Sequence, residues 1–523
     1  MGYSFRSTIS LMKDGSDGVC GYSAVATCNG WKLQSVSRPT GTTLDPTTDI
    51  DGLRHATDLC AHEACQEIPD PRPRIALLTP YTGGNLGDAA IQDAMIANIC
   101  LRLPGAQFSG ISLNCDNFVR RHGVGAFPLC ASDRTFYGMS RPRVEDQPGD
   151  GERFTSKATT NGLNAGALKR ALKSVPGLGP CLKKARIWVT TIPREIRHSV
   201  EGYRFLRMQD VLIVSGGGQL DEEWGGPWGH PFTLFKWAVL ARIARVPYVM
   251  ASVGACKVTS ITSRLFLSAT LRMAQYRSYR DKNSREIAAG LLQRTAGDSI
   301  VPDLAFSLLP SELPPSAGIR SISGGRAIVA ISPIAFAKPG NWPYQNRALY
   351  DRYLLQMAHV VSQLLKRDCF LVIVWSSEDD KSVIPELLER LDDESKNRLA
   401  QQMHVPALST WKDLVASLED VDWLIASRLH SAILGLVTHK PIIAISFDPK
   451  VDWVMEDLSQ TEYLLQIRDF TATEVIKALD RIELRRGVVL EQIDSYQHRI
   501  ISVCALQYDA LAELIMVARR RSN

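Results

Sequence analysis

"RIALLTPYTGGNLGDAAIQDAMIANICLRL", Arg74–Leu103, joins three kinds of sequence in succession. Its first eight residues form a short apolar run that is typical of a buried strand. The glycine-rich "TGGNLGD" that follows is typical of a tight loop. In the remainder, apolar residues recur with helical spacing. A strand, a loop and a helix in this order predict the start of an α/β domain with a parallel sheet.

The same alternation continues along most of the chain. Short apolar runs such as "DVLIVSGGGQL", "PYVMASVGA" and "AIVAISPIAF" alternate with helical stretches such as "TLFKWAVLARIARV" and "YDRYLLQMAHVVSQLLKR". We therefore predict the α/β fold class, with two Rossmann-like domains whose parallel sheets face a central cleft.

Composition shifts set the expected boundaries. Residues 1–72 are mixed and rich in Ser, Thr, Gly and Asp without periodicity, so we expect a poorly ordered extension. Residues 73–312 should form the first domain, with a surface insertion around 130–200. A Pro- and Gly-rich linker follows at 313–326. Residues 327–523 should form the second domain and end in helices.

The composition is that of a soluble globular protein with a sizeable core: 523 residues, 45% of them hydrophobic and 22% charged. A net charge of +5 over this length does not indicate a nucleic-acid binder, but it leaves cations available for small anions. The eleven cysteines are scattered, as expected for reduced thiols. Cys60, His62 and Cys65 have no second pair at zinc spacing, so no metal site is predicted.

No secretory signal is evident, because the N-terminus lacks a continuous apolar region. The most apolar long stretch begins at Phe232. Lys236, Arg242 and Arg245 interrupt it, so a pair of buried elements explains it better than a membrane span. We expect a cytoplasmic protein and leave peripheral contact with the inner face of the membrane open.

Ligands of open parallel sheets bind beyond the carboxyl ends of the strands, so the loops there are candidates for a site. Asn85, Gly87 and Asp88 belong to the first such loop. The start of the following helix offers free N–H groups to an anion or a sugar hydroxyl. The loop is equally consistent with a tight turn in which Asp88 caps the helix.

A second glycine-rich loop follows the strand "VLIV". Gly216, Gly217 and Gly218 would let a substrate lie against the backbone, or would let the next helix approach the sheet. The amide of Gln219 comes next and suits a sugar hydroxyl.

Cations stand in several of the later loops. Arg280 follows one strand and is either half of a solvated ion pair or an anion clamp. In "IASRLHSAILG", Arg428, His430 and Ser431 lie where a strand passes into a helix, and Lys450 follows the next strand. Arginine binds carboxylate or phosphate, and histidine transfers protons near neutral pH. A histidine satisfied within the core is the alternative.

Several ordered segments resemble the polysaccharide pyruvyl transferase family. They are "GGNLGDAAI", "VLIVSGGGQL", "SYRDKNS", "VPDLAF", "DWLIASRLHSAILGL" and "KPIIAISFDPKV". The resemblance implies a two-domain fold like that of the GT-B glycosyltransferases. It also implies transfer of a pyruvyl group from phosphoenolpyruvate to two hydroxyls of a sugar, with a cyclic ketal formed, phosphate released and no metal or organic cofactor. The expected acceptor is an exopolysaccharide or cell-wall polymer residue, free or as a lipid-linked oligosaccharide.

The resemblance also assigns roles. His430 would be the acid and base, and the donor would be bound by cations and a neighbouring hydroxyl. The resemblance places Arg280, Arg428 and Lys450 in donor binding, and Asn85, Gly87 and Asp88 in the acceptor and backbone loops. From their positions in the sequence we add Ser431 to the donor-binding residues, and Gly216, Gly217, Gly218 and Gln219 to the loops.

Two other interpretations fit the same pattern. A GT-B type glycosyltransferase that uses a nucleotide sugar would have the same two domains and glycine loops. A non-catalytic carbohydrate-binding protein on this scaffold would need no proton-transfer group.

Overall fold

The computed structural model describes residues 72–80, 83–131, 193–293, 297–340, 342 and 345–522, together with the strands β1 (Ser23–Thr27) and β2 (Gly30–Gln34). The chain divides into two compact units, Met1–Pro69 and Asp70–Asn523. In the first unit β1 and β2 pair antiparallel. Most of the predicted extension at 1–72 and of the predicted insertion at 130–200 lies outside the described residues.

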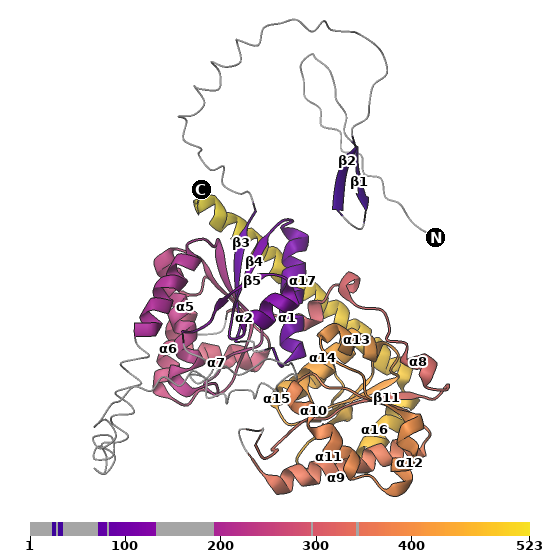
Figure 1. Cartoon of the computed structure of the whole chain (residues 1–523). Coiled ribbons are helices and arrows are strands. Elements are labelled where there is room, and N and C mark those ends of the chain that lie inside the picture. The colour runs from indigo at the N-terminus through magenta and orange to yellow at the C-terminus, as the bar shows by residue number, and fades with distance from the viewer. Residues whose placement is uncertain are drawn as a thin grey trace, which may run out of the picture. The chain divides into compact units, whose positions relative to one another are not determined.

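The first sheet of the larger unit is parallel throughout (Figure 1). Its strand order is β10-β9-β8-β6-β3-β4-β5, and β7 pairs with β8. The strands are β3 (Arg74–Leu78), β4 (Gln107–Ser112), β5 (Gly125–Pro128), β6 (Val211–Ser215), β7 (Gly218–Leu220), β8 (Tyr248–Ala255), β9 (Tyr276–Tyr279) and β10 (Ser299–Ile300).

Helices cover both faces of this sheet, because successive side chains of a strand point to opposite faces. In β3, Ile75 and Leu77 join one hydrophobic core, and Ala76 and Leu78 join another. The first core includes α1 (Leu86–Arg102) and α2 (Cys115–His122), and the second includes a helix at residues 193–206, α5 (His230–Ala244), α6 (Ile261–Met273) and α7 (Lys282–Leu292).

The second sheet is also parallel, with strand order β13-β12-β11-β14-β15-β16. Its strands are β11 (Ile328–Ser332), β12 (Phe370–Ile373), β13 (Met403–His404), β14 (Trp423–Ala426), β15 (Ile442–Ser446) and β16 (Leu464–Gln466). Its helices are α9 (Arg347–Lys366), α10 (Glu378–Lys381), α11 (Val383–Glu389), α12 (Asp393–Gln402), α13 (Trp411–Glu419), α14 (Leu429–Val437), α15 (Pro449–Asp457) and α16 (Ala472–Leu484).

Short helices complete the chain between and beside the sheets. They are η2 (Gly226–Trp228), η3 (Leu304–Ser307), η4 (Pro310–Glu312), α8 (Ile319–Ile322) and η5 (Thr461–Tyr463). The predicted linker at 313–326 thus contains α8. The two parallel sheets confirm the predicted α/β, GT-B-like fold class.

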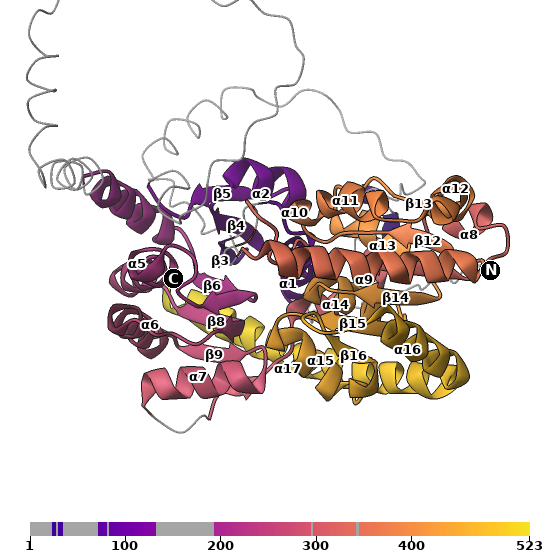
Figure 2. The ribbon, with the colours of Figure 1, turned by 90° about the horizontal axis from the view of Figure 1, so that it is seen from below.

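The last helix, α17 (Arg486–Ser522), returns from the second sheet to the first, as Figures 1 and 2 both show. Ile493, Ile500 and Ile515 are fully buried along one face of it. Near its end Arg519 pairs with Asp210 at 2.9 Å. Among the described helices it is the one long and apolar enough to cross a membrane by length and composition, and a third of that stretch is buried. The contact of α17 with the first sheet was not predicted from the sequence.

Strand order determines where the loops of a site can lie. In each sheet the first strand lies in the interior, beside β6 in one case and beside β14 in the other. The connections on the two sides of such a pair leave in opposite directions, which opens a crevice at the carboxyl ends of the strands. Both glycine-rich loops flank the first of these switch points, and Arg428 and His430 follow β14 at the second.

Candidate active site

Backbone hydrogen bonds join loops from the two sheets. The amide of Leu86 donates to the carbonyl of Ser376 at 2.8 Å, and the amide of Glu378 donates to the carbonyl of Gly84 at 2.9 Å. One loop follows β3 and the other follows β12. The carboxyl ends of the two sheets therefore meet at this place.

Asn85 begins α1 at the same contact. Its side-chain oxygen accepts hydrogen bonds from the amides of Gly87 at 2.9 Å and Asp88 at 3.4 Å. Asparagine is a preferred N-cap because its side chain satisfies these otherwise unpaired amides. The alternative in which Asp88 caps the helix is therefore wrong, and the Asp88 carboxylate is available to the site.

Gly87 allows the two halves of the unit to approach closely. A Cβ atom at this position would lie 1.9 Å from Cγ of His430, so only glycine leaves space for the imidazole. His430 is in the first turn of α14 and its side chain is 12% exposed. The first glycine loop and the "RLH" segment, far apart in sequence, thus form one site.

Asp303 links this histidine to Arg280. Its carboxylate is 3% exposed, and Oδ2 lies 3.5 Å from Nη1 of Arg280 and 3.8 Å from Nε2 of His430. Neither Nη2 of Arg280 nor Nε2 of His430 has a hydrogen-bond partner among the described residues, although both atoms are buried. The site therefore contains two buried nitrogen atoms, one of a guanidinium and one of an imidazole, that lack a hydrogen-bond partner beside one carboxylate.

A bulge in β8 places Asp303. Ser252 has a positive φ of 54°, and its hydroxyl shares its one proton between the carbonyl oxygens of Val301 at 2.7 Å and Pro302 at 2.6 Å. Such a conformation costs a non-glycine residue about 1 kcal/mol, which this hydrogen bond offsets. The bulge draws the 301–303 segment against the sheet and brings the Asp303 carboxylate to the site.

Lys450 and Asp221 complete the charged cluster. Nζ of Lys450 lies 3.4 Å from Oδ2 of Asp448 at the start of α15. Asp221 follows β7, is 5% exposed, and has one carboxylate oxygen without a hydrogen-bond partner among the described residues. Charge interactions connect Lys450 with Arg280 and Asp221.

The pKa values of the carboxyl groups in the cluster are shifted in different directions. Burial raises the pKa of Asp88, against the attraction of His430. Burial also raises the pKa of Asp221, to about 7, against the attraction of Lys450. Burial disfavours the charged form of Asp303 too, but its interactions with His430 and Arg280 outweigh this and lower its pKa. Asp303 is thus the carboxylate that stays ionised between the two donors.

Arg428 turns away from this cluster. Its Nε and Nη2 donate to the two carboxylate oxygens of Asp380 at 2.7 and 2.9 Å, and Asp380 is fully buried. Its guanidinium lies 5.5 Å from the ring centre of Trp342. A bidentate ion pair of this kind holds the loop before α14 in place. The predicted contact of Arg428 with a donor stays a prediction.

Ser431 is also occupied within the second domain. Its hydroxyl lies 2.7 Å from that of Ser332 and donates to that of Ser376 at 3.1 Å. These hydroxyls tie together the ends of β11 and β12 and the start of α14. The predicted role of Ser431 in donor binding stays a prediction.

The second glycine loop turns sharply beside the cluster. Gly216 and Gly217 have positive φ values of 55° and 71°, and Gly218 begins β7. The Gln219 amide donates to the carbonyl of Gly216 at 2.7 Å, and its oxygen lies 3.0 Å from Nε2 of His230. Gln219 therefore holds the turn, and its predicted role toward a sugar stays a prediction.

The structure thus gathers some predicted residues and separates others. Gly87, Asp88, Arg280, His430 and Lys450 lie together, whereas Arg428 and Ser431 brace the loops behind them. Sequence reasoning missed Asp303 and Asp380. Asp303 lies in "VPDLAF", one of the segments that resemble the family. In the sequence alone, an aspartate at this place cannot be distinguished from an ordinary helix N-cap.

Comparison with known proteins assigns this site to a family. A sequence profile described as polysaccharide pyruvyl transferase matches residues 85–449, which include the cluster from Asn85 to His430. A search of curated proteins finds no significant match.

Several solved structures match this chain at low similarity. A UDP-GlcNAc 2-epimerase from Neisseria meningitidis bound to UDP-GlcNAc has 8% identity and a TM-score of 0.47, over 84% of this chain and 100% of that one. A glycosyltransferase from Rickettsia africae ESF-5 has 10% identity and a TM-score of 0.46, over 86% and 99%. The E. coli ADP-heptose LPS heptosyltransferase II has 13% identity and a TM-score of 0.38, over 79% and 99%. The chemistry of this chain is argued from its own residues.

The contact of Gly87 with His430 predicts a specific steric coupling. Gly87→Ala should lower the free energy of unfolding by about 1–3 kcal/mol, because the new methyl group overlaps the imidazole. Adding His430→Ala should relieve much of that loss, as urea denaturation of both single variants and the double variant would measure. Gly290→Ala is the control, since Gly290 of α7 has open space around it, and it should gain about 0.5–1 kcal/mol. Simple additivity of the two single effects would contradict the coupling.

The Arg428–Asp380 pair predicts a stability defect. Arg428→Ala leaves a fully buried carboxylate without its cation and should destabilise the protein by about 3 kcal/mol. Arg326→Ala removes a partner from Asp368, whose side chain is 66% exposed, and should cost less than about 1 kcal/mol. Thermal and urea unfolding would compare them, and equal small effects would show that the buried pair does not brace the loop.

Asp221 predicts a pH-dependent stability. Its folded-state pKa is about 7, against 3.8 for the model carboxyl, so above about pH 4 the unfolded chain loses a proton that the folded protein keeps. The free energy of unfolding therefore falls as pH rises from about 4 to 7. Asp221→Asn should be no more stable than the parent near pH 4 and up to about 4 kcal/mol more stable above pH 7. The exposed Asp393→Asn should show no such pH-dependent gain, and a flat difference for both would contradict the assignment.

Proposed function

The chain belongs to the polysaccharide pyruvyl transferase family, and from this premise we propose that it transfers a pyruvyl group from phosphoenolpyruvate to two hydroxyls of a sugar residue. The product is a cyclic ketal on an exopolysaccharide or cell-wall polymer, and phosphate is released. One observation carries the proposal. Nη2 of Arg280 and Nε2 of His430 are both buried without a hydrogen-bond partner among the described residues, and the charge of Lys450 acts on the same cluster.

The donor has the chemistry that these side chains bind. Phosphoenolpyruvate carries a carboxylate and a phosphate close together. Its oxygens would satisfy Nη2 of Arg280, Lys450 would supply a further charge, and Nε2 of His430 would face the methylene carbon of the donor. Raised pKa values at Asp88 and Asp221 support the proposal, because protonated carboxyls would not repel the donor.

Proton transfer through His430 completes the reaction scheme. Protonated His430 gives its proton to the methylene carbon C3 of the donor, which makes C2 electrophilic. One sugar hydroxyl bonds to C2 and returns its proton to His430. The C2–O bond to phosphate then breaks, and phosphate leaves with its charge held by the cations. The second hydroxyl bonds to C2, and its proton leaves with the phosphate.

Asp303 has a positioning role in this scheme. Its ionised carboxylate lies within 4 Å of both Arg280 and His430 and would orient the two groups toward one donor. The scheme uses no metal or organic cofactor. The proposed location is the cytoplasm, where phosphoenolpyruvate is available.

A direct test compares His430→Ala with His359→Ala, which removes an exposed histidine of α9. With phosphoenolpyruvate and a panel of lipid-linked or nitrophenyl sugars, the first variant should lose about 10²–10⁴-fold in turnover and keep its unfolding temperature within a few degrees. The second should match the parent. Released phosphate and product mass are the readouts. Near-normal turnover of His430→Ala would refute the proton-transfer role, and nucleotide release from a nucleotide sugar would favour a glycosyltransferase instead.

A further inference from the structure

The outer helices of the first sheet expose several large apolar side chains. These helices, at residues 193–206, α5 and α6, lie on the side of the first sheet away from the second (Figures 1 and 2). We call this surface the outer face. Its exposed apolar residues are Ile196, Val200, Trp228, Ile243, Ile261 and Leu265, with exposures from 45% to 77%.

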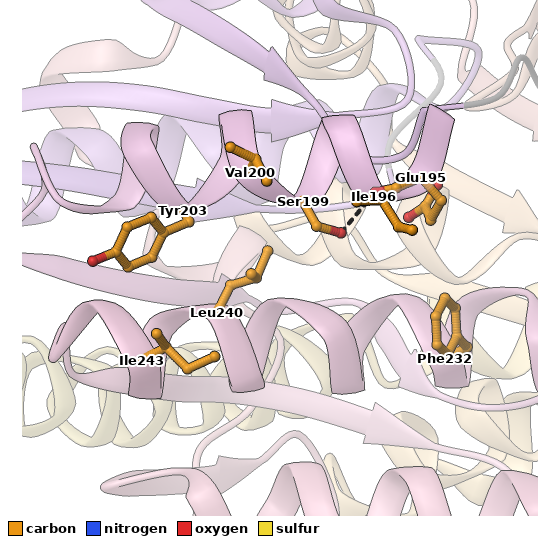
Figure 3. Close-up of a pocket in the computed structure, with 8 residues that line it drawn as sticks. All are labelled: Glu195, Ile196, Ser199, Val200, Tyr203, Phe232, Leu240 and Ile243. Atoms are coloured by element: carbon orange, nitrogen blue, oxygen red, sulfur yellow. Dashed lines mark hydrogen bonds between the residues drawn. The ribbon is translucent and has the colours of Figure 1, made fainter. Parts of the chain in front are cut away.

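An apolar groove lies within the outer face. Between the 193–206 helix and α5 is a pocket of about 500 Å³. Figure 3 shows Val200 and Tyr203 of one helix opposite Leu240 and Ile243 of the other. Gly202 lets the helices approach, since a Cβ there would lie 3.2 Å from the Trp237 ring. The groove is remote from the charged cluster and has no role in the proposed reaction.

Aromatic side chains extend the outer face toward the active site. Trp228, Phe232, Phe235 and Phe266 form a connected group with ring centres 5.2–5.6 Å apart. Tryptophan and phenylalanine at such a surface suit the boundary between lipid headgroups and acyl chains. The segment that carries Trp228 begins at Asp221, so a short stretch of chain joins this aromatic group to the charged cluster.

The charge of this region is one-sided. Residues 230–280 contain eight lysines and arginines and no aspartate or glutamate, although the whole chain has 55 acidic residues among 523. Arg242, Arg245, Arg264 and Arg272 are exposed on α5 and α6. The 193–206 helix adds cations of its own, and its Glu195 and Glu201 are paired with Lys236 and Arg197.

We propose that the outer face docks on a lipid bilayer that contains anionic lipids. Apolar side chains among exposed arginines match an interface where acyl chains lie beneath negative headgroups. A patch of this kind is larger than the isolated apolar residues of an ordinary surface. α5 and α6 themselves carry no carboxylate, and the nearest acidic residues are Glu222, which accepts hydrogen bonds from Thr259 and Ser260 at the start of α6, and its neighbour Glu223. The association is peripheral, because the helices keep their opposite sides in the core.

Docking would bring the active site to the membrane surface. The segment from Asp221 to Gly229 connects the charged cluster with the exposed Trp228 and the start of α5. An acceptor held in the bilayer by a lipid would then reach the cluster without leaving the membrane. This last step rests on the proposed function, whereas the docking itself does not.

Vesicle flotation of the full chain tests the docking. The protein should float with vesicles of phosphatidylcholine and about 30% phosphatidylglycerol, and much less with phosphatidylcholine alone. Raising the salt from about 0.1 M to about 0.5 M should weaken binding, because it screens the arginines. Failure to bind anionic vesicles at low salt would overturn the proposal.

Paired variants identify the surface. Replacing two arginines in Arg242→Gln/Arg264→Gln should weaken binding about 25-fold, at about fivefold for each cation. Lys396→Gln/Lys477→Gln, which changes exposed lysines of α12 and α16, should leave it unchanged. Ile243→Glu should reduce binding strongly, and Leu355→Glu, at an equally apolar exposed position of α9, should not.

Two further measurements separate this proposal from its competitors. With a soluble acceptor the outer-face variants should keep parental turnover, so loss of membrane binding is distinguishable from failure of the proposed reaction. Equal loss of vesicle binding in the control variants would overturn the assignment of the surface. Sedimentation velocity that finds a dimer, abolished by Ile243→Glu, would assign the face to a second copy of the chain and also overturn it.

Discussion

The buried carboxylate of Asp303 holds together a site that neither sheet forms alone. It lies within 4 Å of Arg280, which follows β9, and of His430, which begins α14 beyond β14. A buried carboxylate is stable only when cations or donors compensate it, so the approach of the two domains and the ionisation of Asp303 support each other. Gly87 makes the approach sterically possible by leaving space for the imidazole.

The same constraint explains why an arginine and a histidine share the strand-to-helix turn "SRLHS". Arg428 turns back into its own domain and neutralises the buried Asp380. His430, two residues on, crosses to the other domain. One side chain therefore fixes the turn, and the other uses that fixed position to present a proton-transfer group beside Arg280 and Lys450. Arg428 therefore has the positioning role, and His430 has the proposed chemical role.

The two faces of the first sheet are covered by different sets of helices. One is covered by α1 and by α17, which returns from the second domain and buries Ile500 and Ile515. This return helix ties the domains together from behind the site. The other face is covered by α5, α6 and the 193–206 helix, whose outward sides are apolar and basic. The second domain and the proposed membrane surface thus lie on opposite sides of the first sheet.

The sequence by itself determined the alternating elements, the two parallel sheets and the loops that carry Gly87, Arg280 and His430, because strand and helix periodicity and glycine turns are local properties. Only the tertiary structure decided which charges face one another. In the folded protein Arg428 binds Asp380, Asp303 lies between Arg280 and His430, and α17 extends from the second sheet to the first. Such pairings join residues up to hundreds of positions apart, and no local spacing encodes the direction in which a long side chain turns.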